Sequence, residues 1–300
     1  MSVASVDDGP TPEQRRIIEA LQTGYFGIDG PITVDPMEPE RVAAAIADPD
    51  ARHRLIQMMI VLEVARHPPS AATATAVERY ARWADVDEPM LIVARDAVEG
   101  ARDFVNADFL RFYEPEVAPP EFTDVDPVTI PESLRHLSEC RPGTLGRAFT
   151  DFYERYGLDL PGTADPPPGY TMADYVNVMV KHDFSHVLAG YEPNNGVDEL
   201  ALNMMLVSVS DGGHHHFCNL MGSLSLHETG IFESTEETPK QASLDRPGAP
   251  EVFVEAMRRG AECGADFWDI DHLAVADEPL EEVRRELGIP PRIVPPAPRQ

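Results

Sequence analysis

The sequence predicts an all-α protein, a helical bundle built around a helical hairpin and preceded by a smaller N-terminal helical bundle. Three observations predict this class. Apolar residues between positions 38 and 112 recur at steps of three and four, as they do on one face of an α-helix. Capping boxes open two segments, one from Thr11 to Gln14 and one from Thr171 to Asp174. Alternating apolar and polar runs of strand length are scarce.

Start and stop signals give the expected helices in order. Pro12 is at the first position of a helix that runs toward Gln22, and the prolines at 49, 68 and 69 divide the region 38–112 into four or five helices. Gly190 ends the helix that the second capping box opens. The later helices are expected near 132–139, 144–156, 172–189, 198–210, 251–263 and 279–287.

Prolines also mark the expected domain organisation. Five of them lie between Glu114 and Pro131, where the helical period is lost, so we place a domain boundary there. The predicted parts are an N-terminal helical bundle (1–115), a proline-rich linker (116–131), a second helical domain (132–290) and a proline-rich tail (291–300).

The charge balance restricts the classes of partner. The chain has 300 residues, 43% apolar and 25% charged, which is ordinary for a globular protein. Its 52 acidic and 24 basic side chains give a net charge of -28. Such a surface repels phosphate backbones and anionic headgroups, so no nucleic acid is expected as a partner. For the same reason any membrane contact is expected to be peripheral.

Cysteine usage and hydropathy indicate a cytoplasmic protein. The three cysteines are odd in number and far apart, which fits neither a disulfide framework nor a Cys-x-x-Cys metal site. The N-terminus has no basic start followed by an apolar stretch, so no signal peptide is expected. The most apolar window, Leu55 to Ala65, is shorter than the about 20 residues that span a bilayer.

The helix predicted at 172–189 carries a candidate metal site. His182 and His186 are four residues apart and therefore lie on one face of the helix. Asp183 borders the same face, so two imidazoles and a carboxylate can converge on one cation. Ten histidines also produce such spacings by chance, and a His–Asp pair without metal is the alternative interpretation.

A fourth ligand is expected from the next helix. The turn residues YEPNNG lead into a helix that begins near Asp198 and Glu199, which returns beside the end of the preceding helix. Glu199 is therefore placed as a ligand. Two nitrogen and two oxygen ligands favour Zn²⁺ and also admit iron, manganese or magnesium.

The segment HDFSHVLAGY, followed by DELAL, resembles the coenzyme Q biosynthesis protein 4 family. The hallmark of that family is His-Asp-x-x-His, about eleven residues and then Glu. TLGRAFTDFYERYGLD and EPLEEVRRELGIPP resemble its entry helix and its C-terminal end, so the likeness covers roughly 130–290 and the predicted domain 132–290. It implies that His182, Asp183, His186 and Glu199 are metal ligands and catalytic residues. Twelve residues separate His186 from Glu199, which leaves Asp198 as the fallback ligand.

The resemblance also implies a function. The expected reaction is metal-dependent removal of the carboxyl group at C1 of a prenylated aromatic head group in quinone biosynthesis, with or without hydroxylation at that carbon. The implied partners are a prenylated aromatic or isoprenoid lipid substrate, and further copies of the chain or a biosynthetic complex. Met179, Leu188, Met204 and Met205 are candidates to line an apolar groove, or are plain core residues.

Two alternative functions stay open. One is a non-catalytic lipid-binding scaffold with a structural metal. The other is an HD-type metal-dependent phosphohydrolase, which would need a further distant histidine and aspartate.

A second group of histidines follows two glycines, in the order Gly212, Gly213 and then His214 to His216. One of these histidines could add a ligand or act as a proton shuttle near the metal. Three consecutive helical residues point in three directions, so at most one would face the site. His227 and Glu228, farther along, are predicted to be surface residues.

Overall fold

The structure is a computed structural model that describes residues 2–32, 35–88, 91, 134–159, 172–210, 212–229 and 242–298. Every regular element in these ranges is a helix, and they contain no β-strand, only an isolated bridge between Thr144 and Pro279. The predicted all-α class is therefore confirmed.

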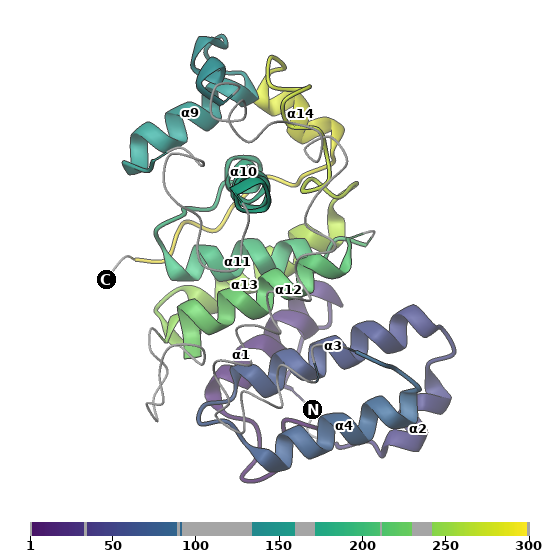
Figure 1. Ribbon diagram of the computed structural model, residues 1–300. Helices are drawn as coiled ribbons and strands as arrows, with labels where there is room; N and C mark the ends of the chain where they lie inside the picture. The colour runs from purple at the N-terminus through teal and green to yellow at the C-terminus, as the bar shows by residue number, and fades with distance from the viewer. Residues whose placement is uncertain are drawn as a thin grey trace.

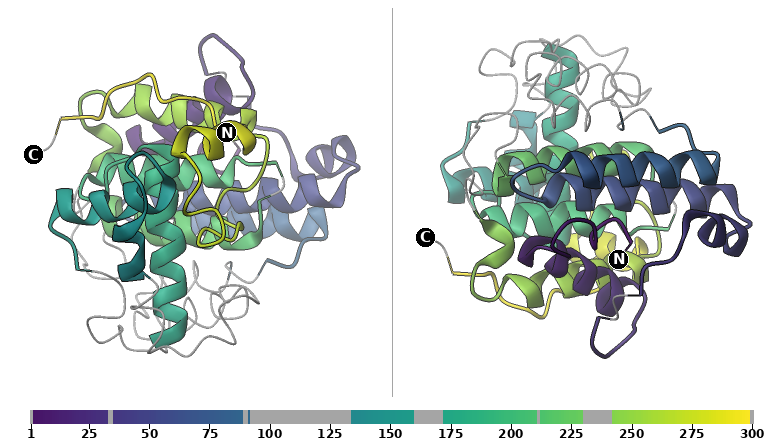
Figure 2. Two further views of the ribbon diagram at one scale, coloured as in Figure 1. Left: turned by 90° about the horizontal axis from the view of Figure 1, so that it is seen from above. Right: turned by 90° about the horizontal axis from the view of Figure 1, so that it is seen from below.

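The described helices form layers (Figure 1). The N-terminal helices are α1 (Pro12–Glu19), the π-helix η1 (Ala20–Tyr25), α2 (Pro39–Ala45), α3 (Pro49–Ala65) and α4 (Ala71–Ala84). The later helices are η2 (Leu137–Glu139), α9 (Leu145–Tyr156), α10 (Met172–Ala189), α11 (Gly196–Val207), α12 (His214–Leu224), η3 (Ser225–Thr229), η4 (Ser243–Asp245), α13 (Ala249–Glu262) and α14 (Leu280–Glu286). In Figure 1, α11, α12 and α13 form a central layer between α9, α10 and α14 on one side and α1, α3 and α4 on the other. The view from below in Figure 2 shows α3 and α4 side by side.

Local signals account for the helix ends that frame the site. The Thr11 capping box is confirmed, because the Gln14 N–H donates to Thr11 Oγ1 and the Thr11 N–H donates to Gln14 Oε1. Helix α10 ends at Ala189, and Gly190 follows it with a φ of 78°, a left-handed conformation that favours glycine. The capping residue predicted at position 171 lies outside the described residues.

Two glycines set the packing of α13. A Cβ on Gly260 would lie 2.1 Å from the carbonyl oxygen of Met205 in α11, and one on Gly24 would lie 2.5 Å from that of Val254. No real side chain tolerates such distances, so glycine alone lets α11 and η1 approach α13 this closely. The N-terminal helices thereby join the same hydrophobic core as α11 and α13. The predicted linker 116–131 lies outside the described residues, and the division into two domains stays a prediction.

The described part of the predicted proline-rich tail, residues 291–298, packs against the helical bundle. The N–H groups of Ile293 and Val294 donate to Glu255 Oε1 over 2.6 and 2.9 Å. Asn195, at the start of α11, donates through Nδ2 to the Ala297 carbonyl over 3.0 Å.

None of the described helices is long and apolar enough to cross a membrane.

Glu228 is buried, so its predicted surface position is wrong. The reason is that η4 folds back over η3, and the Leu244 N–H donates to Glu228 Oε2 over 2.8 Å. The other carboxylate oxygen has no hydrogen-bond partner within the described part of the chain. Burial raises the pKa of Glu228 to about 7, and the nearby carboxylates of Glu13 and Asp245 add to the increase. The hydrogen bond from Leu244 lowers the pKa but does not outweigh these effects.

This burial predicts a pH-dependent gain in stability for the variant Glu228→Gln. The pKa of Glu228 in the folded protein, about 7, lies above the ordinary value of 4.5. Between pH 4.5 and pH 7 the native state therefore binds more protons than the unfolded chain. Stability therefore falls as pH rises through this window. Removing the charge is expected to raise the free energy of unfolding by up to about 3 kcal/mol at pH 8, and by less than about 1 kcal/mol at pH 5. Urea unfolding at both pH values measures the difference, and an equal effect at pH 5 and pH 8 would contradict it.

Candidate metal centre

Helices α10 and α11 form a hairpin that places the predicted residues. His182 and His186 lie on the last two turns of α10, and Glu199 lies on the first turn of α11. Asn195 caps α11 by accepting a hydrogen bond from the Val197 N–H over 3.2 Å, which fixes where the second helix begins. The hairpin therefore returns Glu199 beside the two histidines.

The distances within this group suit a cation. His182 Nε2 lies 3.3 Å from Glu199 Oε2, and His186 Nε2 lies 3.3 Å from Glu199 Oε1. One ligand atom of each residue lies within 4.8 Å of the other two. Bonds of about 2.0–2.2 Å at a tetrahedral angle place neighbouring zinc ligands roughly 3.3–3.6 Å apart. The three side chains, called here the hairpin cluster, can therefore close around one divalent ion with small movements.

The hydrogen bonds of His186 leave one ring nitrogen for a metal. Its Nδ1 donates to the Tyr191 carbonyl over 3.0 Å, so Nε2 carries the lone pair. The side chain is fully buried, and Nε2 has no hydrogen-bond partner among the described residues. A buried acceptor without a donor is unfavourable, whereas a bound cation would satisfy it. The residues present thus fit a metal site.

Asp183 lies behind His182 and outside the hairpin cluster. Its Oδ1 is 3.0 Å from His182 Nδ1, on the opposite side of the ring from Glu199. Its other oxygen accepts a hydrogen bond from the Tyr153 hydroxyl of α9. A carboxylate in this position orients the imidazole and directs Nε2 toward the ion. The sequence predicted a direct ligand here, whereas the structure places Asp183 against His182 Nδ1 and the Tyr153 hydroxyl, outside the three-residue cluster.

Tyr153 was not predicted from the sequence as part of the site. The available signal was its helical spacing from Phe149, which puts both rings on one face of α9. Phe149 stacks on Phe184 of α10, with ring centroids 4.1 Å apart. This packing brings the Tyr153 hydroxyl to Asp183.

Asp198, the fallback ligand, points elsewhere. Its carboxylate accepts two hydrogen bonds from Arg292, over 2.8 and 2.9 Å, and a third from the Glu192 N–H over 2.8 Å. Adjacent helical positions differ by about 100° in direction, so Asp198 and Glu199 face different partners. The structure places Glu199, and not Asp198, beside the histidines.

The charges of the hairpin cluster are coupled. Burial lowers the pKa of His182, but the carboxylates of Glu199 and Asp183 outweigh it and raise the pKa to about 10. Burial in turn raises the pKa of Glu199, but the neighbouring imidazoles of His186 and His182 hold it well below its usual range. The group is therefore an ion pair when no cation is present, and cation binding must displace a proton.

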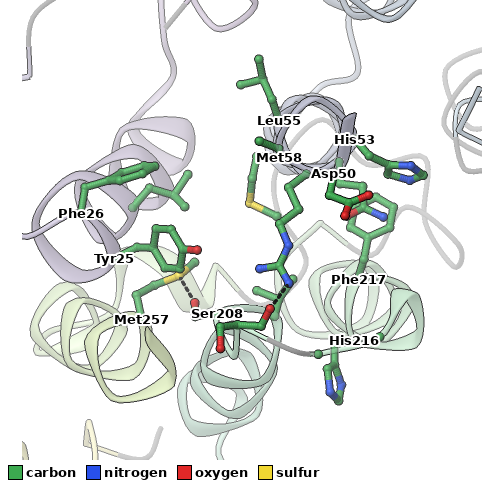
Figure 3. A pocket seen from close by; sticks show the side chains of 18 of the residues that line it. Tyr25, Phe26, Asp50, His53, Leu55, Met58, Ser208, His216, Phe217 and Met257 are labelled. Carbon is green, nitrogen blue, oxygen red and sulfur yellow. Dashed lines mark hydrogen bonds between the residues drawn. The ribbon is translucent and has the colours of Figure 1, made fainter. Parts of the chain in front are cut away.

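The candidate groove residues lie in the core. Leu188, Met204 and Met205 are fully buried and belong to the hydrophobic core, and Met179 is half-buried. A cavity of about 990 Å³ lies elsewhere, between η1, α3, the C-terminal end of α11 and the N-terminal end of α12 (Figure 3). Its lining residues are mostly apolar and include no member of the hairpin cluster.

His215 and His216 do not join the hairpin cluster. With Asp266 they form a second group, in which one ligand atom from each residue lies within 4.8 Å of the others. Burial and the neighbouring His216 lower the pKa of His215 to about 4, so its ring is neutral at pH 7. Asp266 was missed because no pattern in the sequence connects it with histidines fifty residues away.

The fold and these groups define an all-α protein whose described residues include two largely buried His–His–carboxylate groups, each able to hold a metal ion. No protein-family model and no curated protein matches the chain significantly. Among solved structures, the chain is similar to a crystal structure described as a "Putative ubiquinone biosynthesis protein" from Nostoc punctiforme PCC 73102. The sequence identity is 14%, the match covers 80% of this chain and 98% of that chain, and the TM-score is 0.35.

Proposed function

We propose that this chain is a divalent-metal protein of quinone biosynthesis that decarboxylates C1 of a prenylated aromatic head group. One observation carries the metal part of the proposal. The buried Nε2 of His186 has no hydrogen-bond partner in the described ranges and lies 3.3 Å from Glu199 Oε1. The choice of substrate is supported by the resemblance of HDFSHVLAGY and DELAL to the coenzyme Q biosynthesis protein 4 family.

The chain supplies the ligands and their orientation. His182, His186 and Glu199 would hold the ion, and a divalent cation there supplies a Lewis acid for a carboxylate or ring hydroxyl. Asp183 fixes the His182 ring, with Tyr153 behind it. The side chain of His182 is 21% exposed, whereas that of His186 is fully buried, so a head group would approach from the His182 side.

The proposed reaction balances without an oxidant. The bond between C1 and the carboxyl carbon breaks, CO₂ leaves, and the electron pair remains on C1, which then takes a proton from water. Binding of an acidic substrate at a negatively charged protein needs a local positive charge, which the bound ion would provide.

The test is turnover of a prenylated hydroxybenzoate by the metal-loaded full chain, with CO₂ release and the mass of the product as readouts. We expect His186→Ala to reduce turnover by more than about 100-fold, because it removes the most buried ligand. His136→Ala, at an exposed histidine, is the matched control and should retain full turnover. Full turnover by His186→Ala would overturn the proposal.

Chelation separates this function from the scaffold alternative. In the Asp266→Asn variant, where the hairpin cluster is the metal group under test, loss of turnover with an unchanged circular dichroism spectrum supports a catalytic metal, whereas unfolding on chelation supports a structural one. The same acid without its prenyl tail is the second substrate to assay. If it reacts equally well, the metal chemistry stands and the lipid assignment is wrong. Hydrolysis of a phosphoester in place of decarboxylation would support the HD-type alternative.

A further inference from the structure

The second histidine group lies where the start of α12 meets the loop after α13. His215 and His216 are 8% and 1% exposed, and the Asp266 side chain is 9% exposed. The two imidazole rings are 4.1 Å apart between centroids, and the Trp268 ring lies 5.8 and 5.9 Å from them. Three polar side chains are thus enclosed in a largely dry environment, where each polar atom needs a partner.

Two ring nitrogens in this group lack such a partner. His216 Nε2 lies 2.7 Å from Asp266 Oδ2, but His216 Nδ1 makes no hydrogen bond to any described residue. His215 Nε2 makes none either, and the nearest carboxylate oxygen, from Asp269, is 3.8 Å away. A cation would satisfy the unpartnered Nε2 of His215 and would replace the proton between His216 Nε2 and Asp266 Oδ2.

The backbone before the histidines makes room for both rings. A Cβ on Gly212 would lie 2.7 Å from His216 Cδ2, and one on Gly213 would lie 2.7 Å from His215 Nδ1. The Gly-Gly-His-His-His order therefore lets both imidazoles fold back over their own backbone. The carboxylate is fixed as well, because Asp266 Oδ1 accepts a hydrogen bond from the Trp268 N–H over 3.0 Å.

We propose that His215, His216 and Asp266 form a second divalent-metal site, suited to Zn²⁺, which joins the start of α12 to the 264–269 loop. This inference goes beyond the proposed function and does not depend on it. The ligand atoms already lie within 4.8 Å of one another, so closure around one ion needs shifts of about 1 Å or less. Two nitrogens and a carboxylate oxygen are ligands that zinc accepts, and a water or Asp269 completes four-fold coordination.

The surroundings indicate a structural role for this ion. His216 is among the residues that line the 990 Å³ cavity, but its ring points away from the cavity interior (Figure 3). The ion would therefore lie behind the cavity wall. Lys181 is almost fully buried and donates to Asp269 Oδ1 over 2.7 Å, so Asp269 is held beside His215. An ion here would fasten α12 to the loop and keep that wall in place.

The test is the zinc content of the purified full chain after exhaustive dialysis. We expect two equivalents in the wild type and one in Asp266→Asn, which preserves the shape of the side chain. His186→Ala should also retain one, and the double variant His186→Ala/Asp266→Asn should retain none. His136→Ala is the control and should bind two. Circular dichroism verifies that each variant is folded, and Asp266→Asn decides the outcome if a histidine variant is insoluble.

A second measurement separates the two sites. In the His186→Ala background, added Zn²⁺ should raise the melting temperature, because the second group is still present to bind it. The same addition should leave the double variant unchanged. An Asp266→Asn protein that holds as much zinc as the wild type would overturn the second site. Loss of one equivalent in His186→Ala but not in Asp266→Asn would leave the hairpin cluster as the one supported site.

Discussion

Replacing Glu199 by glutamine is expected to lower the affinity of the hairpin cluster for Zn²⁺ by at least about 100-fold while the protein stays folded. Among the described residues, Glu199 is the one carboxylate that faces both histidines, at 3.3 Å from each. Glutamine keeps the shape of the side chain but replaces a charged oxygen by a neutral one, which is a poor ligand for a divalent cation. Because Asp183 still accepts a hydrogen bond from His182, the helix pair should keep its arrangement.

Competition with a chromophoric zinc chelator measures this loss. The background should be Asp266→Asn, so that binding at the second histidine group does not obscure the result. Glu139→Gln is the control, since that side chain is 78% exposed and lies outside the cluster. Affinity unchanged from the background would remove Glu199 from the ligand set.

The preceding residue is expected to show the opposite behaviour. Asp198→Ala should lower the free energy of unfolding by about 3–5 kcal/mol and leave zinc binding by the folded protein intact. The Asp198 side chain is fully buried, and its bidentate pair with Arg292 holds the 291–298 segment near α11. Removal of the carboxylate leaves the guanidinium charge buried without its partner, which is the main source of the loss.

Urea unfolding provides the measurement for Asp198→Ala. Asp151→Ala is a suitable control, because its ion pair with Arg147 on α9 is exposed and such pairs contribute at most about 1 kcal/mol. If Asp198→Ala lost its zinc and kept its stability, Asp198 would be a ligand and the roles of the two acidic residues would be reversed.

Much of the fold could be predicted because its signals are local. The capping box at Thr11 and the glycine at position 190 each specify a helix end within a few residues. The spacing of His182 and His186 likewise follows from the helical period. The structure confirms these elements, and the site residues come together because the hairpin that joins them is short.

Other features depend on contacts between distant parts of the chain, which local patterns do not reveal. Asp183 meets Tyr153 across two helices, and Asp198 meets Arg292 from the far end of the chain. The spacing to a histidine in the sequence therefore does not distinguish an acidic residue that faces the metal site from one that faces another side chain. Glu228 was assigned to the surface for the same reason, since the segment that covers it comes later in the chain.

The glycine contacts of α13 also affect how the protein folds during synthesis. Helix η1 packs on α13 through Gly24, yet the helix that receives it is made roughly 220 residues later. At about 5–20 residues per second, the N-terminal helices leave the ribosome roughly 10–45 s before their partner exists. During that interval the face of η1 that packs on α13 lacks its partner, and transiently exposed apolar surface of this kind is what chaperones bind. Fusion of a fluorescent folding reporter to truncated nascent chains would therefore detect a stable core only after residue 262 has emerged.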